Sequence, residues 1–243
     1  MRKLLLLLLL TTLFLLSGCS AKESAKSDPM DQGVIEFSKK FPEFKIKDNN
    51  VQNADPAILF AYANYLYKQD KKDDAAFWFY VAQMRNTYLI RITKKDAGAP
   101  PISNELFIRF FQESGFIGNI MIVDTGVNAN SLDPKYSKMN SVYDSASRQN
   151  VRKASSGLGA VINPYAFQNL DKQLARMNQV IEYEKAHPIQ PESLIDPKYL
   201  ISKEEQVKAK EESIQENIEF QKYIQGNKEK IREQRTQNGL PNE

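Results

Sequence analysis

The chain has 243 residues, 42% of them hydrophobic and 26% charged, so it is long enough to bury one substantial core. Its 33 basic residues nearly balance its 30 acidic ones, without the clustered basic excess that nucleic-acid binding requires. One cysteine and one histidine exclude an internal disulfide and supply too few ligands for a structural zinc site. We therefore expect no nucleic-acid partner, no metal and no cofactor.

The N-terminus has the layout of a secretory signal. Arg2 and Lys3 form a short positive region, an apolar run follows from Leu4 to Leu16, and small residues come next. The run is too short for a comfortable membrane span of about 20 residues, whereas its length suits a cleaved signal peptide. Residues 1–18 are therefore predicted to be a signal peptide.

The only cysteine lies directly after this signal. The sequence Leu16-Ser17-Gly18-Cys19 resembles the lipobox of bacterial lipoproteins. The resemblance implies cleavage between Gly18 and Cys19 and attachment of palmitate-type acyl chains to Cys19, which would anchor the protein in a membrane. Because Ser20 rather than Asp follows the cysteine, it also implies sorting to the outer membrane, facing the periplasm. The alternative is an ordinary signal peptide followed by a free thiol.

Residues 19–31 are small and polar without an apolar period, which predicts a disordered tether. Residues 32–201 are predicted to form a helical domain. Its first part is a short apolar cluster around Pro42, which should dock on the core as one short helix, and residues 45–53 read as a polar loop.

Two predicted helices form the centre of the domain. Asp55-Pro56 is a typical helix start, and the helix should continue to about Gln69. After a short polar turn, residues 73–92 read DDAAFWFYVAQMRNTYLIRI, which is more apolar than one helix face can accommodate. A helix that is apolar all round must be enclosed by other segments, so residues 73–92 are predicted to be the central helix.

This pair of helices resembles one tetratricopeptide or Sel-like repeat. The resemblance rests on the spacing of small and aromatic side chains over about 35 residues, namely Ala63, Ala75, Trp78, Phe79 and Ala82. The usual glycine and closing proline are lacking, and no second copy is evident. Because such units are stable only when stacked, dissimilar helices should complete the hairpin. The predicted fold class is therefore all-α, an irregular helical bundle with one repeat-like hairpin, and a true repeat solenoid is the alternative.

Further helices should complete the domain after a break at residues 94–101. A helix capped by Ser103 is expected first, then a buried run at 115–126 that could be helix or strand, then a polar helix over 134–150. Residues 155–159 are small and predict a corner between helices. One continuous helix should then run from Tyr165 to His187, where Pro188 ends it.

The C-terminal part, residues 202–243, is predicted to be a long charged helix over Ser202–Arg235 followed by a tail. Its apolar positions are sparse and drift around the helix, and Gly226 weakens the middle. We expect it to cover little of the core. It is either a solvated surface helix or a weak partner-binding segment.

No set of side chains in the sequence predicts catalysis. Ile122-Val123-Asp124-Thr125-Gly126 resembles the loop of aspartic proteases, but that chemistry requires a second carboxylate on a strand-rich scaffold. Ser156 to Gly159 lacks the third glycine and the lysine of a phosphate loop. His187 is expected to act only at a helix end. We therefore predict that the chain is not an enzyme.

The resulting functional hypothesis is a lipid-anchored envelope protein that binds another protein without catalysis. One specific version is an immunity protein against a toxin delivered into the periplasm, because some Sel-like lipoproteins are similar to such antitoxins. The alternative is a structural or assembly lipoprotein that uses its charged tail. The predicted binding residues are polar positions of the central helix and one arginine beyond it: Gln83, Arg85, Asn86, Arg91 and Arg109.

Overall fold

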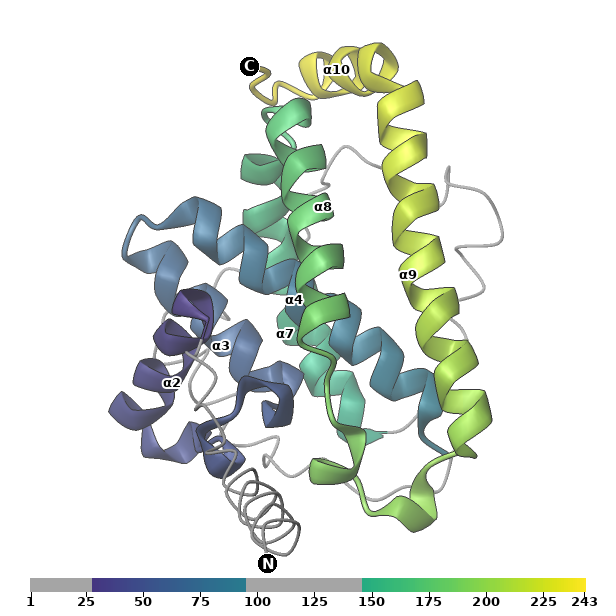
Figure 1. Ribbon diagram of the computed structural model, residues 1–243. Coiled ribbons are helices and arrows are strands. Elements are labelled where there is room, and N and C mark those ends of the chain that lie inside the picture. Colours follow the sequence, from purple (N-terminus) through teal and green to yellow (C-terminus); the bar gives the residue numbers. More distant parts are fainter. Residues whose placement is uncertain (1–27, 95–145) are drawn as a thin grey trace, which may run out of the picture.

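A computed structural model describes residues 28–94 and 146–243, with only the backbone described for 146–155. These residues form seven α-helices linked by turns and short 3-10 helices (Figure 1). Within these two ranges the only β feature is an isolated antiparallel bridge between Thr93 and Leu200. The predicted all-α class is confirmed. The signal sequence, Cys19 and the predictions for residues 95–145 lie outside the described residues.

Helix α2 (Pro29–Lys40) is the first described element, and it starts inside the segment predicted to be the tether. Asp28 caps it by accepting a hydrogen bond from the Met30 amide at 2.9 Å, and Pro29 occupies the first helical position, where its missing N–H costs nothing. Val34 and Phe37 are buried in the core. The predicted docking of this segment is therefore correct, although the helix begins earlier than expected.

Three short 3-10 helices connect α2 to the next helix: Pro42–Phe44, Lys47–Asn49 and Val51–Asn53. The sequence suggested a polar loop over much of this stretch. Yet Phe44, Ile46 and Val51 are at most 1% exposed, so apolar side chains anchor the connection to the core at intervals. Their spacing was irregular, which is why no helical or strand period revealed them.

Helices α3 (Pro56–Lys68) and α4 (Lys72–Ile92) pack closely against each other across a three-residue turn. Asp55 caps α3 by accepting a hydrogen bond from the Ala57 amide at 2.8 Å, as the Asp55-Pro56 sequence predicted. Aromatic pairs fill the interface, with ring centroids 5.7 Å apart for Phe60 and Phe79 and 5.8 Å apart for Tyr62 and Trp78. The predicted helical pair is present, whereas its membership of a repeat family stays a prediction.

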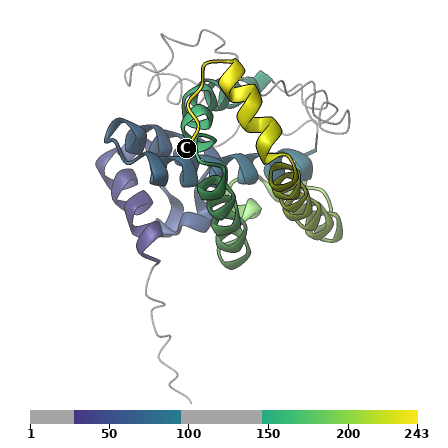
Figure 2. The same cartoon turned by 90° about the horizontal axis from the view of Figure 1, so that it is seen from above.

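Helix α4 is the centre of the bundle, because α3, α7, α8 and α9 all pack against it (Figures 1 and 2). Trp78 is 2% exposed, and Phe79, Val81 and Ile92 are fully buried. Enclosure on several sides explains why apolar residues occur around most of the helix circumference. This arrangement confirms the prediction of an enclosed central helix.

Helix α7 (Ala146–Ala166) continues through the stretch that was predicted to be a corner, so that prediction is wrong. Small residues here serve close helix packing instead of a turn. A Cβ added to Gly159 would lie 3.1 Å from the Phe79 ring, which shows how closely α7 approaches α4. The helix ends at Ala166, two residues after Pro164, which has no N–H to donate to the carbonyl of Ala160 in the preceding turn.

Helix α8 (Leu170–Ala186) is separate from α7, so the predicted continuous helix from Tyr165 to His187 is also wrong. Asn169 is the N-cap of α8, and its side chain accepts a hydrogen bond from the Lys172 amide at 2.9 Å. At the other end, His187 is the C-cap residue, and its amide bonds to the Tyr183 carbonyl at 2.7 Å. The predicted helix-end role of His187 is therefore confirmed.

A connector links α8 to the C-terminal helices and builds a second apolar cluster. It contains 3-10 helices at Pro191–Ser193 and Pro197–Tyr199. Ile189 and Leu200 of this connector pack with the end of α4 and with Ala209. The Ile201 amide also bonds to the Ile92 carbonyl at 2.9 Å, so the connector is tied to the end of the central helix by both backbone and side chains.

The C-terminal segment is two helices, α9 (Lys203–Gly226) and α10 (Lys228–Gln237), where one helix was predicted. Ser202 and Glu205 form a capping box at the start of α9. The chain then turns at Asn227, and α10 lies across the top of the bundle in Figure 1. The predicted weakness at Gly226 is thus the position of a real helix boundary.

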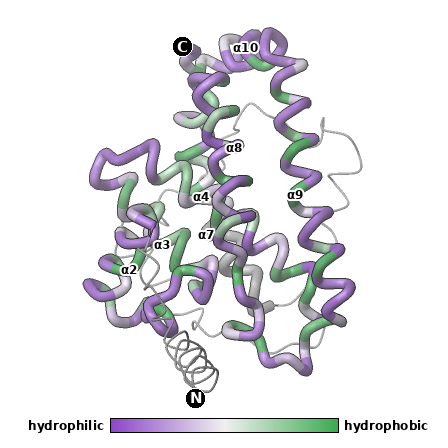
Figure 3. The backbone as a smooth tube through the Cα atoms, in the orientation of Figure 1, coloured by the Kyte–Doolittle hydropathy of each residue, from purple (hydrophilic) through white to green (hydrophobic). Residues whose placement is uncertain are grey.

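The side of α9 that faces the bundle includes small and polar residues. Val207 is 59% exposed, whereas small or polar residues, Gln206, Ala209 and Ser213, are buried. Figure 3 shows hydrophobic and hydrophilic residues mixed along this helix. Small residues allow α9 to approach α4 and α8, so it covers more of the core than its hydropathy pattern indicated.

Candidate functional site

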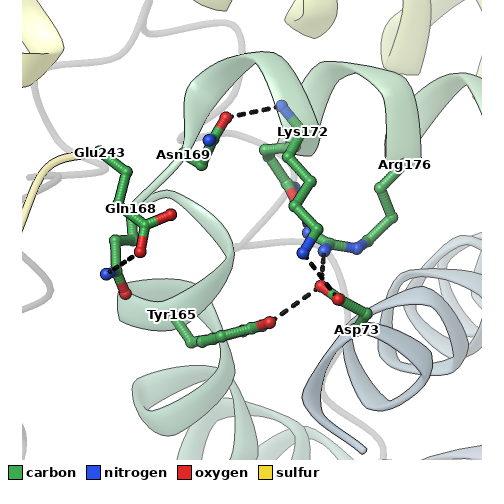
Figure 4. Close-up of polar contacts among 8 residues, drawn as sticks. Asp73, Tyr165, Gln168, Asn169, Lys172, Arg176 and Glu243 are labelled. Carbon is green, nitrogen blue, oxygen red and sulfur yellow. Dashed lines mark hydrogen bonds and ion pairs between the residues drawn. The ribbon is translucent and has the colours of Figure 1, made fainter.

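The start of α4 carries a cluster of polar side chains that meets the junction of α7 and α8. Asp73 lies in the first turn of α4, where a carboxylate is favoured by the helix dipole. Its Oδ1 accepts hydrogen bonds from the Tyr165 hydroxyl at 2.9 Å and from Arg176 Nη2 at 2.7 Å, and its Oδ2 accepts from Lys172 Nζ at 2.7 Å (Figure 4). We call these four residues the Asp73 cluster.

The elements that hold the cluster explain its geometry. Lys172 and Arg176 are four residues apart on α8, so both project from one face of that helix toward α4. Tyr165 comes from the last turn of α7. The Arg176 guanidinium is further fixed by donating to Gln173 Oε1 at 2.6 Å, and this arginine is 5% exposed. The side chains of the cluster therefore hold one another in a fixed arrangement.

Charge and burial shift the titration of two cluster residues. Partial burial alone would raise the pKa of Asp73, but hydrogen bonds from Lys172 and Tyr165, with the positive charges of Lys172 and Arg176, outweigh it and hold that pKa below its ordinary value. Burial and the bond to Asp73 raise the pKa of Tyr165. At neutral pH the cluster thus presents an ionised carboxylate and a neutral phenol between cations.

A lysine and a second tyrosine extend the cluster along the surface. Lys72 Nζ lies 5.9 Å from the centre of the Tyr165 ring and 5.8 Å from that of Tyr67, distances typical of cation–π contact. Lys72 also pairs with Asp70 at 3.1 Å. The side chain of Asp73 is 49% exposed, so this mixed charged and aromatic group is accessible from solvent.

The C-terminus closes over the same end of the bundle. Glu243 accepts from Gln168 Nε2 at 2.7 Å, and its amide donates to the Gln168 carbonyl at 2.8 Å. Arg235 is 1% exposed and donates to the carbonyls of Pro164 at 3.0 Å and Pro241 at 2.7 Å. Lys228 of α10 pairs with Asp171 of α8. These contacts immobilise the surroundings of the Asp73 cluster.

The structure excludes Arg85 from any surface role, so its assignment as a binding residue is wrong. Arg85 is fully buried, and its Nε donates to Glu184 Oε1 at 2.7 Å. Its other nitrogens donate to the Val51 carbonyl at 2.7 Å and to the His187 carbonyl at 2.9 Å. The side chain therefore joins α4 to α8 and to the connection before α3. A single sequence gave no sign of this, because its partners lie 34 to 102 residues away.

The other predicted binding residues do not form one site. Arg91 is partly buried and pairs with Glu216 of α9 at 2.5 Å, so it has a structural partner as well. Gln83 and Asn86 are half-buried positions in the middle of α4. Arg109 lies outside the described residues, as does Asp124 of the protease-like loop. With Arg85 buried and Arg91 paired, the structure does not bring the predicted set together as one exposed surface.

Sequence reasoning missed the Asp73 cluster. The pairing of Lys172 and Arg176 at helical spacing was visible, and so was an acid in the first turn of α4. Both patterns are common on solvated helices, however, and the residues that meet lie 92 to 103 positions apart. Only knowledge of which helices pack together could have joined them.

The described residues offer neither a metal-binding group nor a membrane-spanning helix. Residues 28–94 and 146–243 contain no group of three or more His, Cys, Asp or Glu side chains placed to hold a metal ion. No helix in these ranges combines the length and apolarity needed to cross a membrane. In comparisons with known proteins, no family model, curated protein or solved structure matches the chain.

Proposed function

We propose that this chain is a lipid-anchored protein of the bacterial envelope whose helical domain binds another protein and catalyses no reaction. The Asp73 cluster carries the binding part of this proposal. It is accessible, it combines a tyrosine with charged side chains, and the contacts of Arg176 and Arg235 hold it in place. Tyrosine and arginine are enriched among the residues that dominate protein–protein binding, and a preorganised surface loses less entropy on association.

The anchoring part of the proposal rests on the sequence. Leu16-Ser17-Gly18-Cys19 ends a typical signal and resembles a lipobox, which would place an acyl chain on Cys19 and the domain in the periplasm at the outer membrane. Acylation would also account for a single cysteine in an exported chain, where an exposed free thiol is unusual.

The alternative function is a structural or assembly lipoprotein that contacts envelope components through its C-terminal helices. One observation favours it. Of the three large apolar side chains that are markedly exposed in the described residues, two lie on α9, namely Val207 at 59% and Tyr223 at 40%. Single exposed apolar residues are common on soluble proteins, so this observation weighs less than the fixed cluster.

Site-specific photo-crosslinking distinguishes the two functions. A benzoylphenylalanine replaces the half-buried Tyr165 in one variant and the exposed Tyr223 in a second variant, so that a tyrosine is exchanged in both. We expect a discrete protein adduct in intact cells from position 165 and none from position 223, with the 165 adduct lost in a Lys172→Glu variant. Adducts from 223 alone would support the assembly function. No adduct at either position would contradict the binding role.

The immunity version of the binding function has its own test. A strain lacking the gene should be killed by toxin-producing siblings in a mixed culture, and the complete chain should restore survival. A gene-deleted strain that survives as well as its parent would eliminate the immunity version and leave the wider binding proposal standing.

A further inference from the structure

The first described residue, Asp28, lies beside one end of α8. Asp28 caps α2 with one carboxylate oxygen, and its Oδ2 lies 3.8 Å from Nε2 of His187, the residue that ends α8. One turn further along α2, Asp31 accepts a hydrogen bond from the Tyr183 hydroxyl at 2.5 Å. The start of α2 therefore lies beside the C-terminal end of α8, with the Asp31–Tyr183 hydrogen bond joining the two helices.

The Asp73 cluster lies at the opposite end of the same helix. Lys172 and Arg176 belong to the first two turns of α8, and Gln168 just before it binds the C-terminal Glu243. In Figure 1, α10 and the C-terminus lie across this end of α8 and α2 lies lower in the view. Since α8 has 17 residues, at a rise of about 1.5 Å per residue the two ends are about 25 Å apart.

The length of chain before Asp28 limits how the domain can turn. Nine peptide units separate Cys19 from Asp28, so they span at most about 30 Å when fully extended. The sequence of this link is small and polar, which predicts a tether. A flexible chain of nine residues would have a root-mean-square length of only about 15 to 18 Å. To bring the cluster end to the bilayer, Asp28 would have to lie about 25 Å away, close to the limit of the link.

We propose that the lipid anchor orients the domain, with the Asp28–His187 end of α8 held toward the bilayer and the Asp73 cluster displayed away from it to a periplasmic protein partner. This inference rests on the proposed function, because it requires acylation at Cys19. The new element is that the short link between Cys19 and Asp28 determines which end of the domain a partner can reach. The energetic reason is the chain entropy lost when the link is stretched to nearly its full length.

Two labelled variants of the full lipidated chain test the orientation. Ala186→Cys places a label at the exposed end of α8, and Gln237→Cys places one at the exposed end of α10. The native Cys19 is acylated in the mature protein, so each variant has one reactive thiol. The protein is inserted into vesicles of phosphatidylethanolamine and phosphatidylglycerol that carry a nitroxide on some headgroups, and quenching of a thiol-linked fluorophore is measured.

We expect quenching at position 186 to be at least about twofold stronger than at position 237, since the link keeps the first site near the headgroups. Inserting about 20 Gly and Ser residues before Asp28 should remove most of that difference, because the longer link lets the domain turn. Equal quenching with the native link, or stronger quenching at position 237, would overturn the orientation while leaving the anchor intact. Protein that fails to float with the vesicles would instead overturn the anchor, and with it the orientation.

Discussion

Replacing Arg85 with methionine is expected to lower the free energy of unfolding by about 3–5 kcal/mol, the usual cost of removing one partner of a buried ion pair. The substitution keeps an unbranched side chain but leaves Glu184, which is 4% exposed, without its 2.7 Å partner. It also leaves the carbonyls of Val51 and His187 without the guanidinium that satisfies them. Urea denaturation followed by circular dichroism measures the loss.

The pH dependence of this variant has a defined sign. Burial raises the pKa of Glu184 above its ordinary value of 4.5, and Arg85 is the main group that opposes this effect. Without Arg85, the folded state should hold a proton on Glu184 that the unfolded state has released. A raised pKa of this kind contributes stability at low pH that is lost as the pH rises. The deficit relative to wild type should therefore be smallest below about pH 4.5 and grow above it.

Matched variants separate the ion pair from general damage. Replacing both Arg85 and Glu184 with methionine should recover part of the loss, because no unpaired charge remains buried. Lys185→Met removes a cation whose partner Glu182 is 71% exposed, and it should leave the unfolding midpoint unchanged. A stability loss for Arg85→Met no larger than that of Lys185→Met would show that the buried pair is absent.

Phe79→Ala is the second substitution expected to have a large effect. The Phe79 side chain is fully buried, packs on Phe60 with ring centroids 5.7 Å apart, and lies against Gly159 of α7. Its removal should leave a cavity where α3, α4 and α7 meet and lower the free energy of unfolding by about 3–5 kcal/mol. Thermal or urea denaturation provides the measurement.

Val207→Ala is the control for this core substitution. Val207 also lies on a helix but is 59% exposed, so its truncation should change stability by less than about 0.5 kcal/mol. Similar losses for the two variants would mean that the interface between α4 and α7 is not packed as described. A large loss for Val207→Ala would show instead that the exposed face of α9 is covered in solution.

Local sequence signals predicted the two central helices well. Asp55-Pro56 specifies a start through the cap itself, and α3 begins at Pro56. For α4 the predicted range 73–92 and the observed range Lys72–Ile92 differ by one residue. The boundaries are well predicted because a long apolar segment bounded by charged residues leaves few other positions for the helix ends. Signals of this kind act within a few residues and need no knowledge of the rest of the chain.

The errors arose where distant segments decide the structure. Gly157 and Gly159 suggested a corner, but small residues also permit close helix packing, and the nearness of α4 selects that second use. Arg85 looked like a surface residue because arginine usually is one. Its burial depends on Glu184, which lies 99 positions later in the chain. For the same reason, the meeting of Asp73 with Tyr165, Lys172 and Arg176 could not be predicted from the sequence.

The fluorescence of Trp78 tests the central claim most directly, namely that α4 is enclosed by the other helices. It is the only tryptophan in the chain, it is 2% exposed, and its ring lies 5.8 Å from that of Tyr62 on α3 and 5.4 Å from that of Tyr183 on α8. In the isolated monomer we predict blue-shifted emission that iodide barely quenches, with both properties lost in denaturant. Emission at the wavelength of free indole, quenched equally by iodide before and after unfolding, would contradict the enclosed central helix.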